Sequence, residues 1–146
     1  MKLKQLSLFL ENRPGALSRP MRLLAKAKFN ILTLSIAEAN QFGILRLILQ
    51  DWEAARKLLE KNGLVVKVTD MVAVAVPDQP GGLAKILQVL EKAGINVEFM
   101  YAFTEKRENQ GVLVFRFDDP DGAIKVLQKA KVNVVPGVDL FDTIEA

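Results

Sequence analysis

An internal repeat is the feature that most constrains what this 146-residue chain can fold into. Residues 78–97 repeat residues 12–31 at an offset of 66, and seven of these 20 positions hold the same residue in both copies. A second matching stretch, 43–49 and 111–117, follows at an offset of 68, because the loop before it is longer in the second copy. Two copies are too few for a solenoid. The pattern therefore predicts the duplication of one globular module.

Each copy shows the same series of elements. Apolar residues alternate with other residues in the first strand, a helical spacing follows, and two β-like runs and a second helix lead to a last strand. We expect strands at 6–10, 31–37, 44–49 and 64–69 in the first copy and at 72–76, 97–103, 112–117 and 132–140 in the second. The order βαββαβ is the split-βαβ, ferredoxin-like plan. The sequence thus predicts an α+β fold of two tandem modules, each an antiparallel sheet with its helices on one face.

Prolines and glycines indicate where several of these elements begin and end. Asp119-Pro120 is an acidic N-cap followed by proline at the first helical position,. Asn62-Gly63 should end the second helix of the first copy,. Pro20 falls inside the first helix and removes a backbone donor, so we expect a kink or a late start there,. Pro136 lies in the last strand, which should therefore be an edge strand or contain a bulge,.

The third strand of each copy is apolar on both sides. One face is expected to carry Leu45, Leu47 and Leu49 in the first copy and Leu113, Phe115 and Phe117 in the second. The other face would carry Ile44, Ile48, Val112 and Val114. An apolar second face usually meets another layer, either a second sheet or a partner chain. We therefore expect a homodimer.

The boundary between the copies falls near Asp70, with modules at 1–69 and 70–146. The last strand of the first copy runs into the first strand of the second with only Thr69-Asp70 as a polar break. Because no linker separates them, the modules should be rigidly coupled.

Composition excludes several kinds of chemistry. The chain has no Cys and no His, which removes thiol nucleophiles, imidazole bases and nearly all transition-metal sites,. The net charge is +3, and Lys and Arg are scattered rather than clustered, as on an ordinary solvated surface,. No apolar run approaches the roughly 20 residues of a membrane-spanning helix. We expect a cytoplasmic protein without metal or cofactor that binds neither nucleic acid nor membrane.

The sharpest motif is the turn between the first strand and the first helix of each copy, Asn12–Leu17 and Asp78–Leu83. A short polar acceptor precedes Pro and Gly at a helix start, where free N–H groups and the helix dipole favour an anion. Glycine allows close approach to the backbone, and the Asn or Asp side chain can accept a hydrogen bond from an ammonium group. The turn could therefore hold both ends of an α-amino acid. Alternatively, Asn12 and Asp78 only cap their helices.

These turns, each with a helix ending in Lys-Ala-(Lys/Gly)-(Phe/Ile)-Asn-(Ile/Val) and a following strand, resemble the ACT domain. The resemblance covers nearly the whole chain, and the pair is similar to stand-alone tandem ACT proteins. It implies that an effector, usually an amino acid, binds at the seam between two modules. The implied contacts are Asn12, Pro14, Gly15, Ala16, Leu17, Asn30, Ile31 and Leu32 in the first copy, and Asp78, Pro80, Gly81, Gly82, Leu83, Asn96, Val97 and Glu98 in the second.

Some of these positions have other interpretations. Asn30 and Asn96 could instead be left-handed residues at helix ends. Arg13 and Gln79 could reach a ligand carboxylate or point to solvent. Asn12 stands where the family more usually has an acidic residue, so the two sites could differ in affinity.

The resulting hypothesis is a non-catalytic regulatory protein that binds a free amino acid and signals to a partner enzyme of amino-acid metabolism. An RNA-binding module shares the plan, and residues 111–117 faintly resemble its aromatic third strand, but the first copy has no matching aromatic residue,. An acylphosphatase-like enzyme also shares the plan, but its glycine-rich turn around an arginine is missing. The carboxylates Asp118, Asp119 and Asp121 read as a helix start rather than a catalytic pair,.

Overall fold

The computed structural model of the chain describes residues 1–103, 109–137 and 139–141. The chain divides into two compact units, which we describe separately. Lys4–Thr69 form the N-terminal unit, and Met1–Leu3 with Asp70–Ala146 form the C-terminal unit. These units differ from the proposed modules 1–69 and 70–146 in the placement of the first three residues. No described helix is long and apolar enough to cross a membrane.

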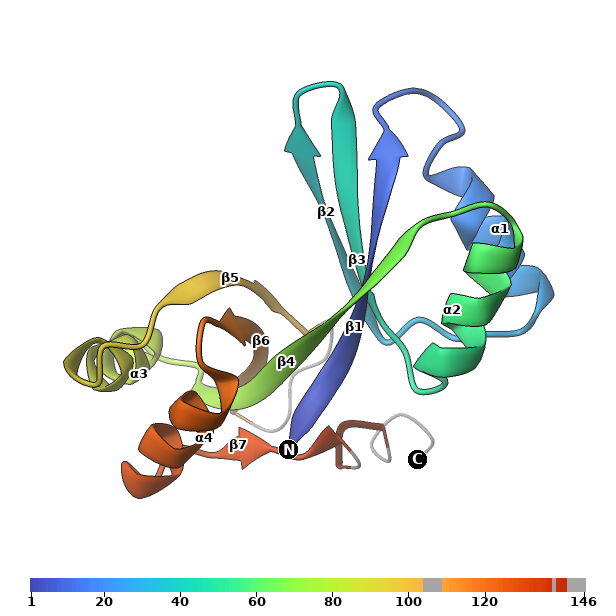
Figure 1. Cartoon of the computed structure of the whole chain (residues 1–146). Helices are drawn as coiled ribbons and strands as arrows, with labels where there is room; N and C mark the ends of the chain where they lie inside the picture. The colour runs from blue at the N-terminus through green and yellow to red at the C-terminus, as the bar shows by residue number, and fades with distance from the viewer. Residues whose placement is uncertain (104–108, 138, 142–146) are drawn as a thin grey trace. The chain divides into compact units, whose positions relative to one another are not determined.

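The N-terminal unit has the predicted ferredoxin-like plan (Figure 1). Its elements are β1 (Lys2–Glu11), α1 (Ser18–Lys26), β2 (Thr33–Ala39), β3 (Phe42–Ile48), α2 (Trp52–Lys61) and the first part of β4 (Val66–Pro77). The strand order is β2-β3-β1-β4, and both helices lie on one face of this sheet. Leu6, Leu8 and Leu10 of β1 pack there with Leu24 of α1 and Leu59 of α2.

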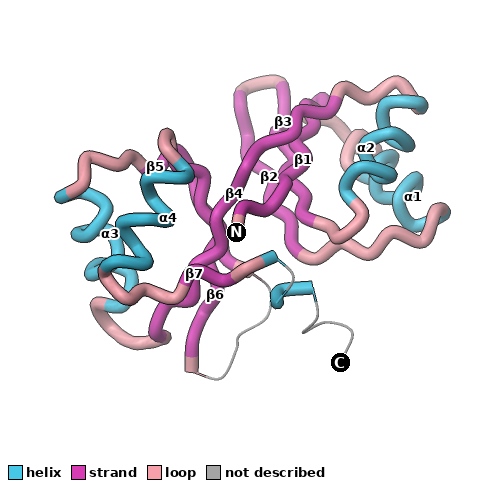
Figure 2. The backbone as a smooth tube through the Cα atoms, turned by 60° about the horizontal axis from the view of Figure 1, so that its bottom comes forward, coloured by secondary structure: helices cyan, strands magenta, loops and turns pink. Residues whose placement is uncertain are grey.

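The C-terminal unit repeats the plan with the second part of β4 as its first strand (Figure 2). The elements that follow are α3 (Gly82–Lys92), β5 (Val97–Ala102), β6 (Gln110–Phe117), α4 (Pro120–Lys129) and β7 (Val134–Val135). The strand order is β7-β4-β6-β5. Phe115 and Phe117 stack in the core at a centroid distance of 5.2 Å, next to Ile86 and Leu90 of α3 and Leu127 of α4.

β4 confirms that the two copies are joined without a linker. The strand is continuous from Val66 to Pro77, and the boundary between the units at Thr69/Asp70 falls inside it. It is therefore the last strand of one unit and the first strand of the other.

The two faces of the third strands are apolar, as predicted. Leu45, Leu47 and Leu49 belong to the core of the N-terminal unit, and Leu113, Phe115 and Phe117 pack in that of the C-terminal unit. Ile48, Val112 and Val114 on the other face are also buried. At the far end of this face in the N-terminal unit, Phe9 is 61% exposed and Phe42 is 51% exposed. These two aromatic side chains leave an apolar patch on the surface.

Most of the predicted start and stop signals are confirmed. The Asp119 carboxylate accepts a hydrogen bond from the Gly122 N–H at 3.0 Å, and Pro120 opens α4. Gly63, with φ of 83°, follows the end of α2. α1 starts late: it begins at Ser18, whereas α3 begins at Gly82, which is equivalent to Ala16. The late start places Pro20 in the first helical turn, where its missing N–H has no cost.

The predicted last strand at 132–140 is wrong in length. β7 contains only Val134 and Val135. Pro136 follows, and its carbonyl accepts hydrogen bonds from the N–H groups of Asp139 (3.1 Å) and Leu140 (3.3 Å) in a helical turn. Because proline cannot donate to the sheet, the strand ends there rather than bulging.

Candidate ligand site

The two strand–helix turns, residues 12–17 and 78–83, share a set of backbone hydrogen bonds. Three hydrogen bonds recur at the repeat offset of 66. In the first turn they join Arg13 N to Glu11 O (2.9 Å), Ala16 N to Arg13 O (3.3 Å) and Arg19 N to Gly15 O (3.2 Å). In the second they join Gln79 N to Pro77 O (2.9 Å), Gly82 N to Gln79 O (3.1 Å) and Lys85 N to Gly81 O (3.1 Å). The sequence repeat is thus also a repeat of local geometry.

Gly15 and Gly81 have the same left-handed backbone, with φ of 87° and 85°. A Cβ atom added at either glycine would meet no atom within 4 Å. Glycine is therefore favoured at both positions by the backbone angle rather than by packing. The space in front of each helix start is open to a ligand.

Gly82, the next residue in the second turn, has a different role. A Cβ atom there would lie 2.3 Å from the carbonyl oxygen of Pro77. The helix start is thus held close against the end of β4. Ala16 occupies the equivalent position of the first turn, so the two turns differ in how closely helix and strand approach.

Asn12 and Asp78 do not stand at the N-cap positions of their helices. The N-cap residues of α1 and α3 are Leu17 and Gly81, each of which follows the proline of its turn. The backbone N–H of Asn12 donates to Gln41 O at 2.9 Å, and that of Asp78 donates to Asn109 O at 2.9 Å. Both residues thus sit where the turn meets the neighbouring hairpin.

A pocket of about 410 Å³ lies beside the second turn and brings part of the predicted site together. It is lined by Val76, Pro77, Asp78, Gln79, Pro80, Leu83, Gly111 and Leu113. Gly111 and Leu113 were missed by sequence reasoning, because only the pairing of Gly111 with Val76 brings β6 to this turn. The pocket combines one carboxylate, that of Asp78, with apolar walls.

The predicted site residues near the start of the second strand of each copy do not line the pocket beside the second turn. The left-handed residues after α1 and α3 are Lys28 and Gly94, with φ of 63° and 71°. The helix-end interpretation of Asn30 and Asn96 is therefore wrong. Asn96 instead exchanges hydrogen bonds with Asp118: its N–H donates to Oδ1 at 3.0 Å, and its carbonyl accepts from the Asp118 N–H at 3.2 Å.

Three further predicted residues contact the protein itself. Glu98 forms an ion pair with Arg116 at 3.6 Å, Leu32 is buried, and Val97 packs against the core. Among the described residues that line the 410 Å³ pocket, none comes from the start of β5. In the first turn, the Arg13 guanidinium forms an ion pair with Glu11.

Comparisons with known proteins identify the family and the fold. A family model described as an ACT domain pair matches residues 1–144. The crystal structure of protein BT0572 from Bacteroides thetaiotaomicron is 41% identical in sequence, covers 97% of this chain and 96% of its own, and superposes with a TM-score of 0.89. No curated protein matches the chain.

More distant structures share the fold. The ligand-free regulatory subunit of aspartate kinase from Thermus thermophilus is 16% identical, with a TM-score of 0.64 over 89% of this chain and 93% of that subunit. Aspartate kinase from Synechocystis is 22% identical, with a TM-score of 0.57 over 91% of this chain and 26% of that enzyme. The family model matches nearly the whole length, and the chain therefore belongs to the ACT domain pair family.

Proposed function

We propose that this chain is a non-catalytic regulatory protein that binds a free α-amino acid at its strand–helix turns. The observation that carries the proposal is the recurrence of one turn geometry, with an open left-handed glycine at 15 and at 81. The pocket beside the second turn adds the carboxylate of Asp78.

The proposed chemistry uses both charges of the ligand. Its carboxylate would sit at the start of α1 or α3, where the first N–H groups have no partner inside the helix and the dipole is positive. Its ammonium group would donate to Asn12 or Asp78. Val76, Leu83 and Leu113 would contact the ligand side chain in the second site. The other proposed contacts are Pro14, Ala16, Leu17, Asn30, Ile31, Leu32, Asn96, Val97 and Glu98, with Arg13 and Gln79 beside the carboxylate.

The proposed output is a signal to a partner enzyme of amino-acid metabolism in the cytoplasm. The Thermus thermophilus protein of the same fold is a regulatory subunit of aspartate kinase, which is consistent with this assignment. The chain lacks histidine and cysteine, and we propose that it has no turnover of its own.

Removing the carboxylate of Asp78 should weaken amino-acid binding about tenfold to a hundredfold. A hydrogen bond to a charged group contributes about 1.5–3 kcal/mol. A thermal-shift screen against the twenty amino acids first identifies the ligand, because binding to the folded state alone raises its stability. Calorimetry then compares Asp78→Ala with Glu91→Ala, which removes an exposed carboxylate of α3 outside the pocket. Asn12→Ala should have a smaller effect, because its acceptor is neutral. Equal affinities for Asp78→Ala and the control would contradict the proposal.

We also propose a homodimer that covers the patch formed by Phe9 and Phe42. These side chains share the sheet face opposite the helices, because Phe9 pairs with Ile44 and Phe42 lies two residues before Ile44 in β3. Exposed apolar patches commonly mark protein interfaces. Sedimentation at micromolar concentration should show a dimer for the wild type and a monomer for Phe9→Glu/Phe42→Glu, while Val65→Glu, at a 78% exposed position, remains dimeric. A wild-type monomer would refute the proposal.

A further inference from the structure

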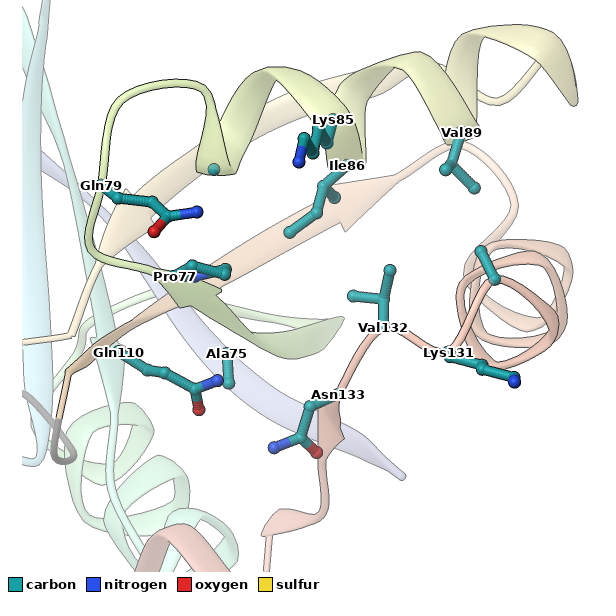
Figure 3. A pocket seen from close by; sticks show the side chains of 12 residues that line it. Ala75, Pro77, Gln79, Lys85, Ile86, Val89, Gln110, Lys131, Val132 and Asn133 are labelled. Atoms are coloured by element: carbon teal, nitrogen blue, oxygen red, sulfur yellow. The ribbon is translucent and has the colours of Figure 1, made fainter.

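A second cavity is lined by residues of α3 and of the turn that precedes it (Figure 3). It has a volume of about 320 Å³ and is bounded by α3, the end of β4 and the segment that joins α4 to β7. We call it the α3–β7 cavity. Its walls include Ile86 and Val89 of α3 and Val132 before β7. Pro77 and Gln79 line both this cavity and the 410 Å³ pocket.

The polar groups of the α3–β7 cavity are suited to an anion. Gln79 and Lys85 line the cavity near the start of α3, and the Gln110 and Asn133 amides lie at the opposite wall (Figure 3). The ammonium group of Lys131 points away from the cavity. No carboxylate is among the described lining residues. A ligand ammonium group would therefore lack a counter-charge here, unlike in the pocket that contains Asp78.

The N-terminal unit provides an internal comparison, because the equivalent gap is bridged. Arg19 and Asn62 stand at the positions equivalent to Lys85 and Ala130. The Arg19 Nη2 donates to the Asn62 carbonyl oxygen at 2.6 Å, which ties the start of α1 to the end of α2. No hydrogen bond joins Lys85 to Ala130, both of which lie in the described part of the chain.

The apolar side chains at this place are also smaller in the C-terminal unit than in the N-terminal unit. Leu23 and Leu64 of the N-terminal unit are replaced by the smaller Val89 and Val132. The C-terminal unit thus has an open cavity with an unbridged lysine where the N-terminal unit has an arginine tie. The two units therefore differ in this region both in a polar contact and in the size of two apolar side chains.

We propose that the α3–β7 cavity binds a small aliphatic monocarboxylate without an ammonium group. Lys85 and the Gln79 amide hold the carboxylate, and Ile86, Val89 and Val132 contact the hydrocarbon. The volume lies at the lower end of the range for small-molecule sites, which are mostly apolar with a few placed polar groups. Gln79 is shared with the amino-acid site proposed above, whereas Lys85, Ile86, Val89 and Val132 lie outside that site.

Calorimetry on the full chain with isovalerate as the probe tests this site. Wild type should show saturable binding, and isovaleramide, which has the same hydrocarbon without the charge, should bind at least tenfold more weakly. Lys85→Ala should lower isovalerate affinity at least tenfold, because Lys131, the other lysine that lines the cavity, points away from it. Lys92→Ala removes an exposed lysine of the same helix outside the cavity and should leave affinity unchanged.

Lys85→Arg distinguishes binding inside the cavity from simple attraction of the anion to a positive charge. The variant keeps the positive charge, but its guanidinium should reach the Ala130 carbonyl as Arg19 reaches Asn62, and isovalerate affinity should fall at least tenfold. Circular dichroism confirms that each variant is folded. The proposal is overturned if wild type shows no saturable binding, if isovaleramide binds as well as isovalerate, or if Lys85→Ala or Lys85→Arg binds like wild type.

Discussion

Replacing Gly15 and Gly81 together by valine should abolish amino-acid binding while the chain still folds. Both glycines face open space, so a valine side chain at either would occupy the place proposed for the ligand carboxylate. The left-handed backbone at these positions costs a non-glycine residue roughly 1–2 kcal/mol each. The two substitutions therefore lower the free energy of unfolding, but their summed cost is smaller than the total free energy of unfolding of a typical folded domain. Calorimetry measures binding, and circular dichroism checks the fold.

The matched control for this double variant is Gly63→Val. Gly63 has φ of 83° and equally open surroundings, but it lies at the end of α2 rather than in a strand–helix turn. It should show the strain of one left-handed valine, half that of the double variant, with wild-type amino-acid affinity. Wild-type affinity in the folded Gly15→Val/Gly81→Val protein would place the ligand elsewhere and leave the turns with a structural role alone.

Gly82→Ala should lower the free energy of unfolding by about 3 kcal/mol, the upper end of the usual range for overpacking. Its Cβ would lie 2.3 Å from the Pro77 carbonyl oxygen, a backbone atom that cannot rotate away. Gly111→Ala is the control, because its Cβ would meet nothing within 4 Å and its φ is not left-handed. Urea denaturation should show little change for Gly111→Ala. Equal urea midpoints for the two variants would mean that the start of α3 can move away from the end of β4 at little cost in free energy.

The repeat was sufficient to predict the fold plan because both copies carry the same periodicities. The start of α4 was predictable from Asp119-Pro120, whose cap depends on local geometry alone. The length of β7 was not predictable, because residues 132–140 are mostly apolar and indicate a strand, whereas the chain turns after Pro136. Alternation predicts which residues could pair but not where the neighbouring strand ends.

The candidate site was predictable only in part, for a similar reason. Asp78, Gln79, Pro80 and Leu83 lie within one local motif, and the structure brings them to one pocket. Gly111 and Leu113 are more than 25 residues away in sequence and reach the pocket only through the β4–β6 register. The second cavity was missed because it depends on the relation between α3 and the end of α4, which no sequence motif encodes.

The placement of Met1–Leu3 in the C-terminal unit has a consequence for how the chain is made. Leu3 is buried, and a Cβ at Gly137 would lie 2.6 Å from its side chain. These early residues therefore find part of their surroundings only after residue 137 has been synthesised. Domains generally fold as units during synthesis, the N-terminal one first. On the ribosome, Lys4–Thr69 can complete its core first, while the other unit waits for nearly the whole chain to emerge.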